Sequence, residues 1–203
     1  MFRKSALFAA TLALAAGAAS AQSITFTGSG AIGFSQLFDP DGGVFSAGQF
    51  TMGEWGTLRA STGGTYTLTY LGQESAYSDG VRIVVGGQTL TEGNHVGDRI
   101  TGNLVAGQLL DFSFFSSDGS TATNGTSPNG GTHSTFARLA TNMTTSRGTF
   151  QYVLGFNDTA LHDDWDDFVI GVNVAPVPEP QTYALLLAGL GVVGFVARRR
   201  QAR

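Results

Sequence analysis

Apolar and polar residues alternate with a period of two along much of the chain between residues 23 and 174. In residues 65–71 the side chains of Tyr66, Leu68 and Tyr70 share one face and threonines occupy the other, a pattern typical of a half-buried strand. Further strands are expected at residues 23–27, 32–38, 44–50, 109–115, 135–139, 149–156 and 168–174. No helical period interrupts them.

A pair of glycines, Gly86 and Gly87, separates residues 81–85 from residues 88–90, which predicts a hairpin with a two-residue loop. Turn-forming residues divide the other strands at intervals of about ten residues. This spacing predicts an all-β ectodomain over residues 22–174, an antiparallel β-sandwich of jelly-roll type with about eight to ten strands. Residues 116–132 lack large apolar side chains and predict a long surface loop.

The first 21 residues have the three parts of a secretory signal peptide. Arg3 and Lys4 precede an uninterrupted apolar segment, and Ala19 and Ala21 form an A-x-A cleavage site. Export by the Sec route is therefore expected, with a mature chain that begins near Gln22.

The C-terminal end predicts a membrane anchor. Residues 182–197 are uncharged and mainly apolar, and the basic residues Arg198, Arg199 and Arg200 follow directly. The segment is slightly short for a bilayer, but arginine side chains can extend to the interface. A transmembrane helix at residues 182–197 is expected, with residues 198–203 as a basic cytoplasmic tail. A buried core helix is the alternative, but the three arginines that follow it directly would not fit in an apolar core.

A proline-rich linker is expected at residues 175–181, because each proline removes a backbone donor and favours extended geometry. Pro178, Glu179 and Pro180, the apolar segment and the arginine cluster together resemble the PEP-CTERM sorting signal, also catalogued as the ice-binding protein C-terminal domain. The resemblance covers about residues 176–203. The second name gives no evidence that the ectodomain binds ice.

This resemblance implies a Gram-negative bacterium with an exosortase, a membrane transpeptidase that cleaves near Pro178, Glu179 and Pro180. These residues are then a recognition site for another enzyme. The implied route runs through the inner membrane to the cell surface or extracellular matrix. The implied partners are the exosortase, the membrane before processing, and the extracellular polysaccharide of a biofilm.

Charge is distributed unevenly along the chain. Residues 22–180 contain five arginines, no lysine and all 15 acidic residues, so this region carries a net charge of −10. Such a domain repels polyanions, so nucleic acid is not an expected partner. The chain contains no cysteine, which excludes disulfides and thiolate zinc sites.

An acidic run precedes the last expected strand. Asp163, Asp164, Asp166 and Asp167 follow Asp158 within ten residues, and like charges at this spacing favour a counter-ion. Calcium, which binds six to eight oxygen ligands, is the candidate cation, and no other cofactor is expected. The alternative is a solvated acidic loop that protects a strand edge from pairing.

Three functions follow from these observations. The first is a non-catalytic surface or matrix protein, because no nucleophile or metal-hydrolase motif is present and the chain is not expected to be an enzyme. The second is a calcium-dependent carbohydrate-binding module, with Trp165 as a platform for a sugar ring. The third is a glycan-processing enzyme, which needs only two facing carboxylates.

Overall fold

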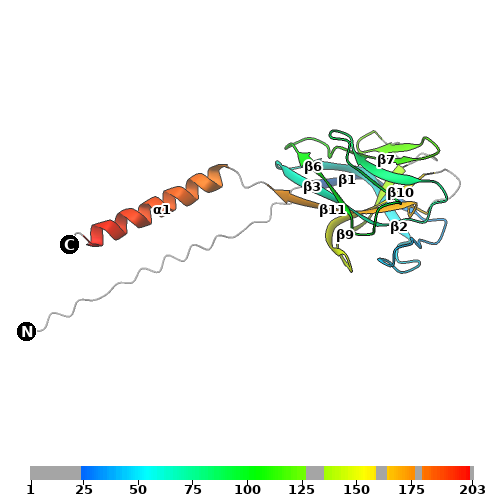
Figure 1. Ribbon diagram of the computed structural model, residues 1–203, viewed down its shortest axis with the longest axis horizontal. Helices are drawn as coiled ribbons and strands as arrows, with labels where there is room; N and C mark the ends of the chain where they lie inside the picture. Colours follow the sequence, from blue (N-terminus) through cyan, green and yellow to red (C-terminus); the bar gives the residue numbers. More distant parts are fainter. Residues whose placement is uncertain (1–23, 127–134, 159–163, 177–179, 202–203) are drawn as a thin grey trace, which may run out of the picture.

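The computed structural model describes residues 24–126, 135–158, 164–176 and 180–201, in which the chain forms eleven strands and one helix (Figure 1). The elements are β1 (Ile24–Gly33), β2 (Met52–Ala60), β3 (Gly64–Gly72), β4 (Asp79–Ile83), β5 (Thr89–Thr91), β6 (Arg99–Leu104), β7 (Phe112–Ser116), β8 (Thr121–Thr123), β9 (Thr135–Thr145), β10 (Gly148–Asn157), β11 (Phe168–Pro176) and α1 (Pro180–Gln201). The expected signal peptide, with Ala19 and Ala21, lies outside these ranges.

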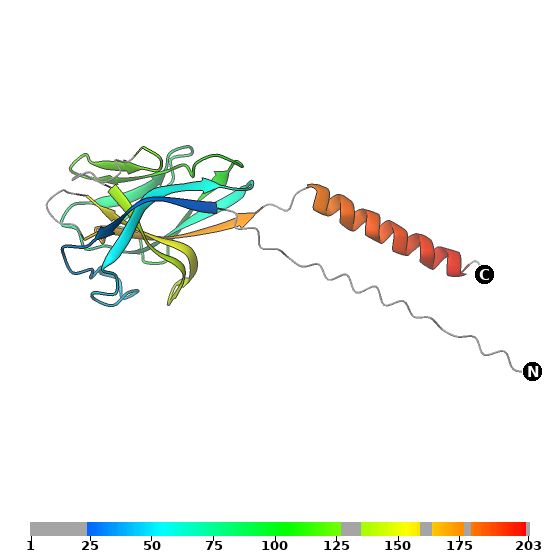
Figure 2. The same ribbon diagram turned by 180° about the vertical axis from the view of Figure 1, so that it is seen from behind.

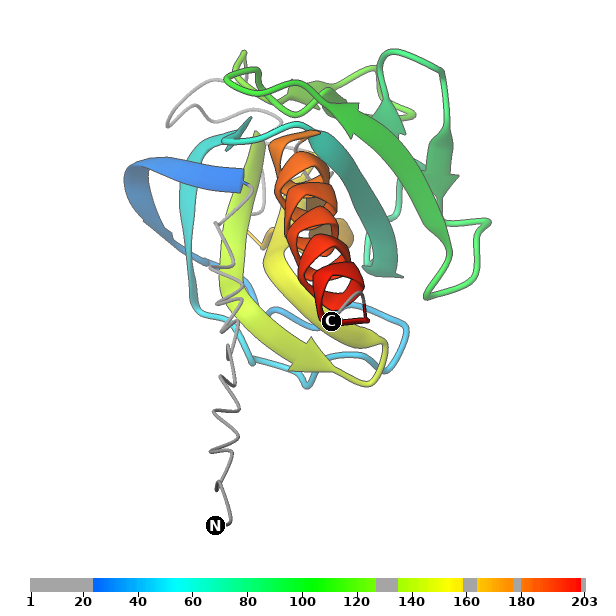
Figure 3. The same cartoon turned by 90° about the vertical axis from the view of Figure 1, so that its left-hand side faces the viewer.

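The strands form two sheets in which every pairing is antiparallel. The larger sheet has the order β1-β2-β9-β10-β11-β3-β6, and the smaller has the order β5-β4-β7-β8. Figures 2 and 3 show the strands of the two sheets stacked in two layers. The expected all-β, antiparallel architecture is confirmed. The division into seven and four strands differs from a jelly roll, which has eight.

Aromatic side chains fill the space between the two sheets. Phe114 of β7 stacks on Phe156 of β10 with a ring-centroid distance of 5.1 Å, and Phe112 meets Phe136 of β9 at 5.4 Å. All four rings are buried. Because these contacts join one sheet to the other, the phenylalanine-rich sequence stabilises the fold without disulfides.

Two expected elements are found with altered bounds. The period-two pattern around Tyr66 is β3, and Tyr66, Leu68 and Tyr70 are buried as expected. The expected hairpin is β4 and β5, but β4 ends at Ile83, so its loop is longer than two residues.

Two expectations in loops are wrong. Residues 44–50 form turns instead of a strand, and the Gly48 N–H donates to Phe38 O at 2.6 Å. Their apolar side chains pack all the same, because Phe45 and Phe50 contact the ring of Phe38 edge-on. The loop expected at residues 116–132 contains β8, which pairs with β7.

Asn124 connects the end of β8 to β2 of the larger sheet. Its side chain accepts a hydrogen bond from Leu58 N at 2.9 Å and donates to Leu58 O and Leu110 O, both at 2.8 Å. Asn124→Ala should lower the free energy of unfolding by about 2–4 kcal/mol, because buried backbone groups lose their partners. Chemical denaturation tests this. Asn103→Ala, on the exposed side of β6, should cost less than about 0.5 kcal/mol, and equal costs would contradict the assignment.

The observed bounds of β11 and α1 differ from the expected linker and the expected basic tail. β11 continues through Pro176 and α1 begins at Pro180, so the expected linker at residues 175–181 is mostly part of these two elements. Arg198, Arg199 and Arg200 form the last turn of α1 and not a separate tail. Cations at this end of a helix interact favourably with its dipole.

The expected transmembrane helix at residues 182–197 is also corrected. Among the described residues, no helix has both the length and the apolar character needed to cross a membrane. α1 begins with the polar residues Gln181 and Thr182, and its apolar part, residues 184–197, would extend only about 21 Å against a hydrocarbon core of about 30 Å. Its described apolar side chains, from Leu185 to Val196, are exposed.

Candidate metal centre and sorting segment

The order of strands in the larger sheet brings three distant loops together. β11 lies between β10 and β3 and is antiparallel to both. The start of β11 therefore pairs with the ends of its neighbours, Phe168 with Phe156 and Val169 with Gly72. The residues that follow β3, those that follow β10 and those that precede β11 therefore meet at the same end of the sheet.

Six acidic side chains gather there in two groups of three. In each group one carboxylate oxygen per residue lies within 4.8 Å of the other two. The inner triad consists of Asp79, Asp158 and Asp167, and the outer triad consists of Glu74, Asp164 and Asp166. The aspartates are at most 7% exposed, whereas Glu74 faces solvent.

Hydrogen bonds hold several of these carboxylates in place. Asp167 Oδ2 accepts from the backbone N–H of Asp158 at 2.7 Å, which joins the end of β10 to the start of β11. Asp158 Oδ2 accepts from Ser75 Oγ at 2.8 Å. In the outer triad, Asp166 Oδ2 accepts from the backbone N–H of Asp39 at 2.6 Å. The loops therefore fix the triads from several sides.

Burial makes the charged forms of these acids unfavourable. Burial, with the nearby Asp158 charge, raises the pKa of Asp79 to about 7, although the hydroxyls of Ser116 and Ser75 lower it in part. Burial also raises the pKa of Asp167 to about 9 and that of Asp166 to about 7, and neighbouring carboxylates add to both. No ion pair joins Asp79, Asp166 or Asp167 to a residue that the structure describes.

These shifts predict a pH dependence for the metal-free protein. The folded-state pKa values of Asp79, Asp166 and Asp167 lie above their ordinary value of 3.8, so between about pH 4 and 7 the folded state binds more protons than the unfolded state. Stability then falls as pH rises, by up to about 1.4 kcal/mol per pH unit for each group. In EDTA, the melting temperature should be higher at pH 5 than at pH 8. A melting temperature that rises over this interval would contradict the burial of these acids as protonated groups.

The structure places three of the four predicted ligands together. Asp164, Asp166 and Asp167 belong to the triads, whereas Asp163 lies outside the described residues. Sequence analysis missed Glu74 and Asp79 and did not include Asp158 among the ligands. Asp79 lies between Ser78 and Gly80, a sequence typical of a turn, and no local pattern connects it with residues more than 70 positions later.

Trp165 cannot serve as the expected sugar platform. Its side chain is 3% exposed and stacks on Phe34 at 5.3 Å. Its backbone has a φ of 56°, a left-handed conformation that a bulky residue rarely adopts. Gly155 allows this geometry, because a Cβ there would lie 2.0 Å from the Trp165 carbonyl oxygen.

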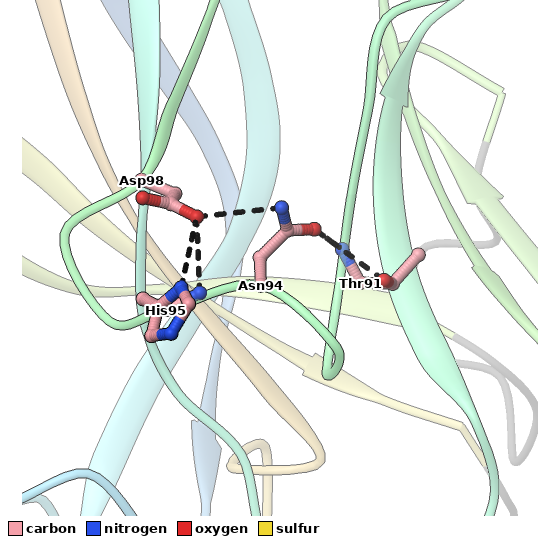
Figure 4. A network of polar contacts seen from close by, with 4 residues as sticks. All are labelled: Thr91, Asn94, His95 and Asp98. Carbon is pink, nitrogen blue, oxygen red and sulfur yellow. Dashed lines mark hydrogen bonds and ion pairs between the residues drawn. The ribbon is translucent and has the colours of Figure 1, made fainter.

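His95, one of three isolated histidines in the sequence, belongs to a surface turn between β5 and β6. Its Nδ1 lies 3.9 Å from Asp98 Oδ2, which also accepts from the His95 N–H at 3.0 Å (Figure 4). Asn94 extends the network to Thr91 N at 2.8 Å. Each contact lies within the turn, so the network closes the loop and resembles no catalytic arrangement.

The residues expected to direct sorting fall at the other end of the chain. Pro178 and Glu179 lie outside the described residues, and Pro180 is the first residue of α1. No curated protein and no solved structure matches the chain. Residues 176–200 do match the family described as the PEP-CTERM protein-sorting motif. The chain therefore carries a PEP-CTERM protein-sorting motif, which implies an exported protein that an exosortase processes at the membrane and sorts to the cell surface.

Proposed function

We propose that this chain is a non-catalytic surface protein of a Gram-negative bacterium, exported by the Sec route and sorted by an exosortase into the extracellular polysaccharide of a biofilm. The observation that carries the proposal is the sorting motif at residues 176–200. The signal-like residues 1–21 supply the export step, and the arginines at the end of α1 supply the basic flank of the motif. Processing releases the two-sheet ectodomain.

A non-catalytic role is supported by the arrangement of the acidic residues. A cavity of about 290 Å³ is lined by Glu74, Asp158, Asp164 and Asp167, together with Tyr77. Glycosidases use two carboxyl groups about 5–9.5 Å apart, one on each side of the bond that they cleave. Here three carboxylate oxygens converge within 4.8 Å in each triad, an arrangement that suits a bound cation.

Carbohydrate binding is a second candidate function, favoured by one observation at this cavity. Tyr77 lines it and is 45% exposed, so its ring is accessible to a sugar as Trp165 is not. Tyr77→Ala should then weaken binding to the polysaccharide of the producing organism at least tenfold in a pull-down assay. Unchanged binding, or no binding by the wild type, would remove this candidate.

Deletion of the exosortase gene in the producing organism tests the main proposal. We expect full-length chain that keeps its C-terminal arginines to accumulate in the cells and the ectodomain to disappear from the surface polysaccharide. An unchanged surface fraction in the deletion strain would contradict sorting by this route. Ectodomain that is processed but does not co-purify with polysaccharide would contradict only the biofilm association.

A further inference from the structure

Asp79 is the most unusual member of the inner triad. It is the first residue of β4, its side chain is 1% exposed, and neither carboxylate oxygen makes a hydrogen bond of full geometry. Ser116, its partner across the β4–β7 pairing, is 6% exposed, and its hydroxyl approaches Asp79 without making a hydrogen bond of full geometry. Buried polar groups are almost always satisfied, so these atoms point to a missing ligand.

The identity of that ligand follows from the surrounding charge. Asp158 and Asp167 bring two further carboxylates within 4.8 Å of Asp79, and the acidic outer triad lies close by. An anion or a neutral apolar group would leave these carboxylates uncompensated at a high cost in free energy. A cation removes the repulsion and satisfies the unpartnered oxygens together.

We propose that the inner triad is a calcium-binding site, in which Asp79, Asp158 and Asp167 supply carboxylate oxygens and Ser116 supplies a hydroxyl oxygen. Oxygens bound to one calcium ion at about 2.4 Å can be at most about 4.8 Å apart, and the triad oxygens lie within that limit. Zinc prefers nitrogen and sulfur ligands. Magnesium retains several waters and uses only one or two carboxylates.

Calcium at this position would join the two sheets. Asp79 starts β4 of the smaller sheet, whereas Asp158 and Asp167 flank the β10–β11 connection of the larger one. An ion held by all three couples the sheets at one end of the core, so the folded state alone presents the complete site. Calcium should therefore stabilise folding in proportion to its free concentration, whether or not the ectodomain binds a carbohydrate or is sorted.

The full chain in detergent is first stripped of metal with EDTA and returned to pH 7.5. Calcium chloride is then added, and calorimetry and thermal unfolding measure its binding to the site. We expect binding with a Kd of roughly 10⁻⁴–10⁻³ M and a rise in melting temperature on the order of 5 °C at millimolar calcium. Asp79→Asn should weaken binding at least tenfold while leaving the calcium-free protein as stable as the wild type or more so. That combination separates a lost ligand from a damaged fold.

Two further variants complete the test. Asp111→Asn removes a charge at the opposite end of the β4–β7 pairing, where Asp111 Oδ2 accepts from Val85 N, and should keep the full calcium response. Ser116→Ala should weaken calcium binding by a smaller factor, and it substitutes for Asp79→Asn if that variant does not fold. Absence of both heat and a melting shift in the wild type would overturn the site. Wild-type affinity for calcium in the Asp79→Asn variant would also overturn it. If that variant does not fold, wild-type affinity in the Ser116→Ala variant would do the same.

Discussion

Replacement of Pro178, Glu179 and Pro180 with alanine is expected to reduce C-terminal processing at least tenfold, so that uncleaved precursor accumulates in the producing cells. The prolines fix their own φ, bias the residues before them toward extended geometry and remove two donors, and the glutamate is the only acid between residues 168 and 203. Alanines at these positions favour helix instead. Immunoblots against tags at each end of the ectodomain measure the precursor and the product.

The expected signal peptide provides the matched control for this experiment. The alanine variant should still lose residues 1–21, because export precedes sorting in the proposed route. A variant that blocks cleavage at Ala19 and Ala21 should instead retain the N-terminal segment. Identical C-terminal processing of the wild type and the alanine variant would show that Pro178, Glu179 and Pro180 do not direct cleavage.

Phe114→Ala is expected to have the largest effect on stability, about 3–5 kcal/mol, or roughly 10 °C in melting temperature. The Phe114 ring is fully buried and stacks on Phe156 with an interplanar angle of 3°, and it also lies 5.8 Å from Phe136. Its removal leaves a cavity between the two sheets. Denaturant unfolding of the full chain in calcium-free buffer measures the loss.

Phe115→Ala is the neighbouring control. Phe115 lies on the opposite face of β7, is only partly buried, and has Arg82 over its ring at 5.8 Å. Its truncation should cost about 1 kcal/mol, mainly the cation–π contact and some burial. If the two variants lost equal stability, the packing of the sheets through Phe114 would be wrong.

The sequence predicted strands where large side chains alternate, and it missed strands in which glycine occupies the buried positions. In β6 the buried positions are Ile100, Gly102 and Leu104. Gly102 resembles a turn residue, but a Cβ there would lie 2.4 Å from the ring of Tyr66, so the glycine makes room for that ring. β2 is hidden by a half-buried glycine, because Gly56 accommodates Phe26. Periodicity cannot distinguish a glycine required by packing from one required by a turn.

Only part of the candidate metal site could be predicted from the sequence, for a related reason. The acidic run before β11 is continuous in the sequence, so Asp164, Asp166 and Asp167 could be singled out. Asp79 lies on the other sheet, and its approach to them depends on the order β10-β11-β3 and on the packing of the sheets. The predicted exposure of the Trp165 side chain was also wrong. The neighbouring charges suggested a surface position, but the ring packs on Phe34.

The intact mass of the protein recovered from the surface of wild-type cells tests the central claim most directly. The account predicts a species that begins near residue 22 and ends near residues 178–180, without Arg198, Arg199 and Arg200. Surface material with the C-terminal arginines still attached would contradict processing through the sorting motif.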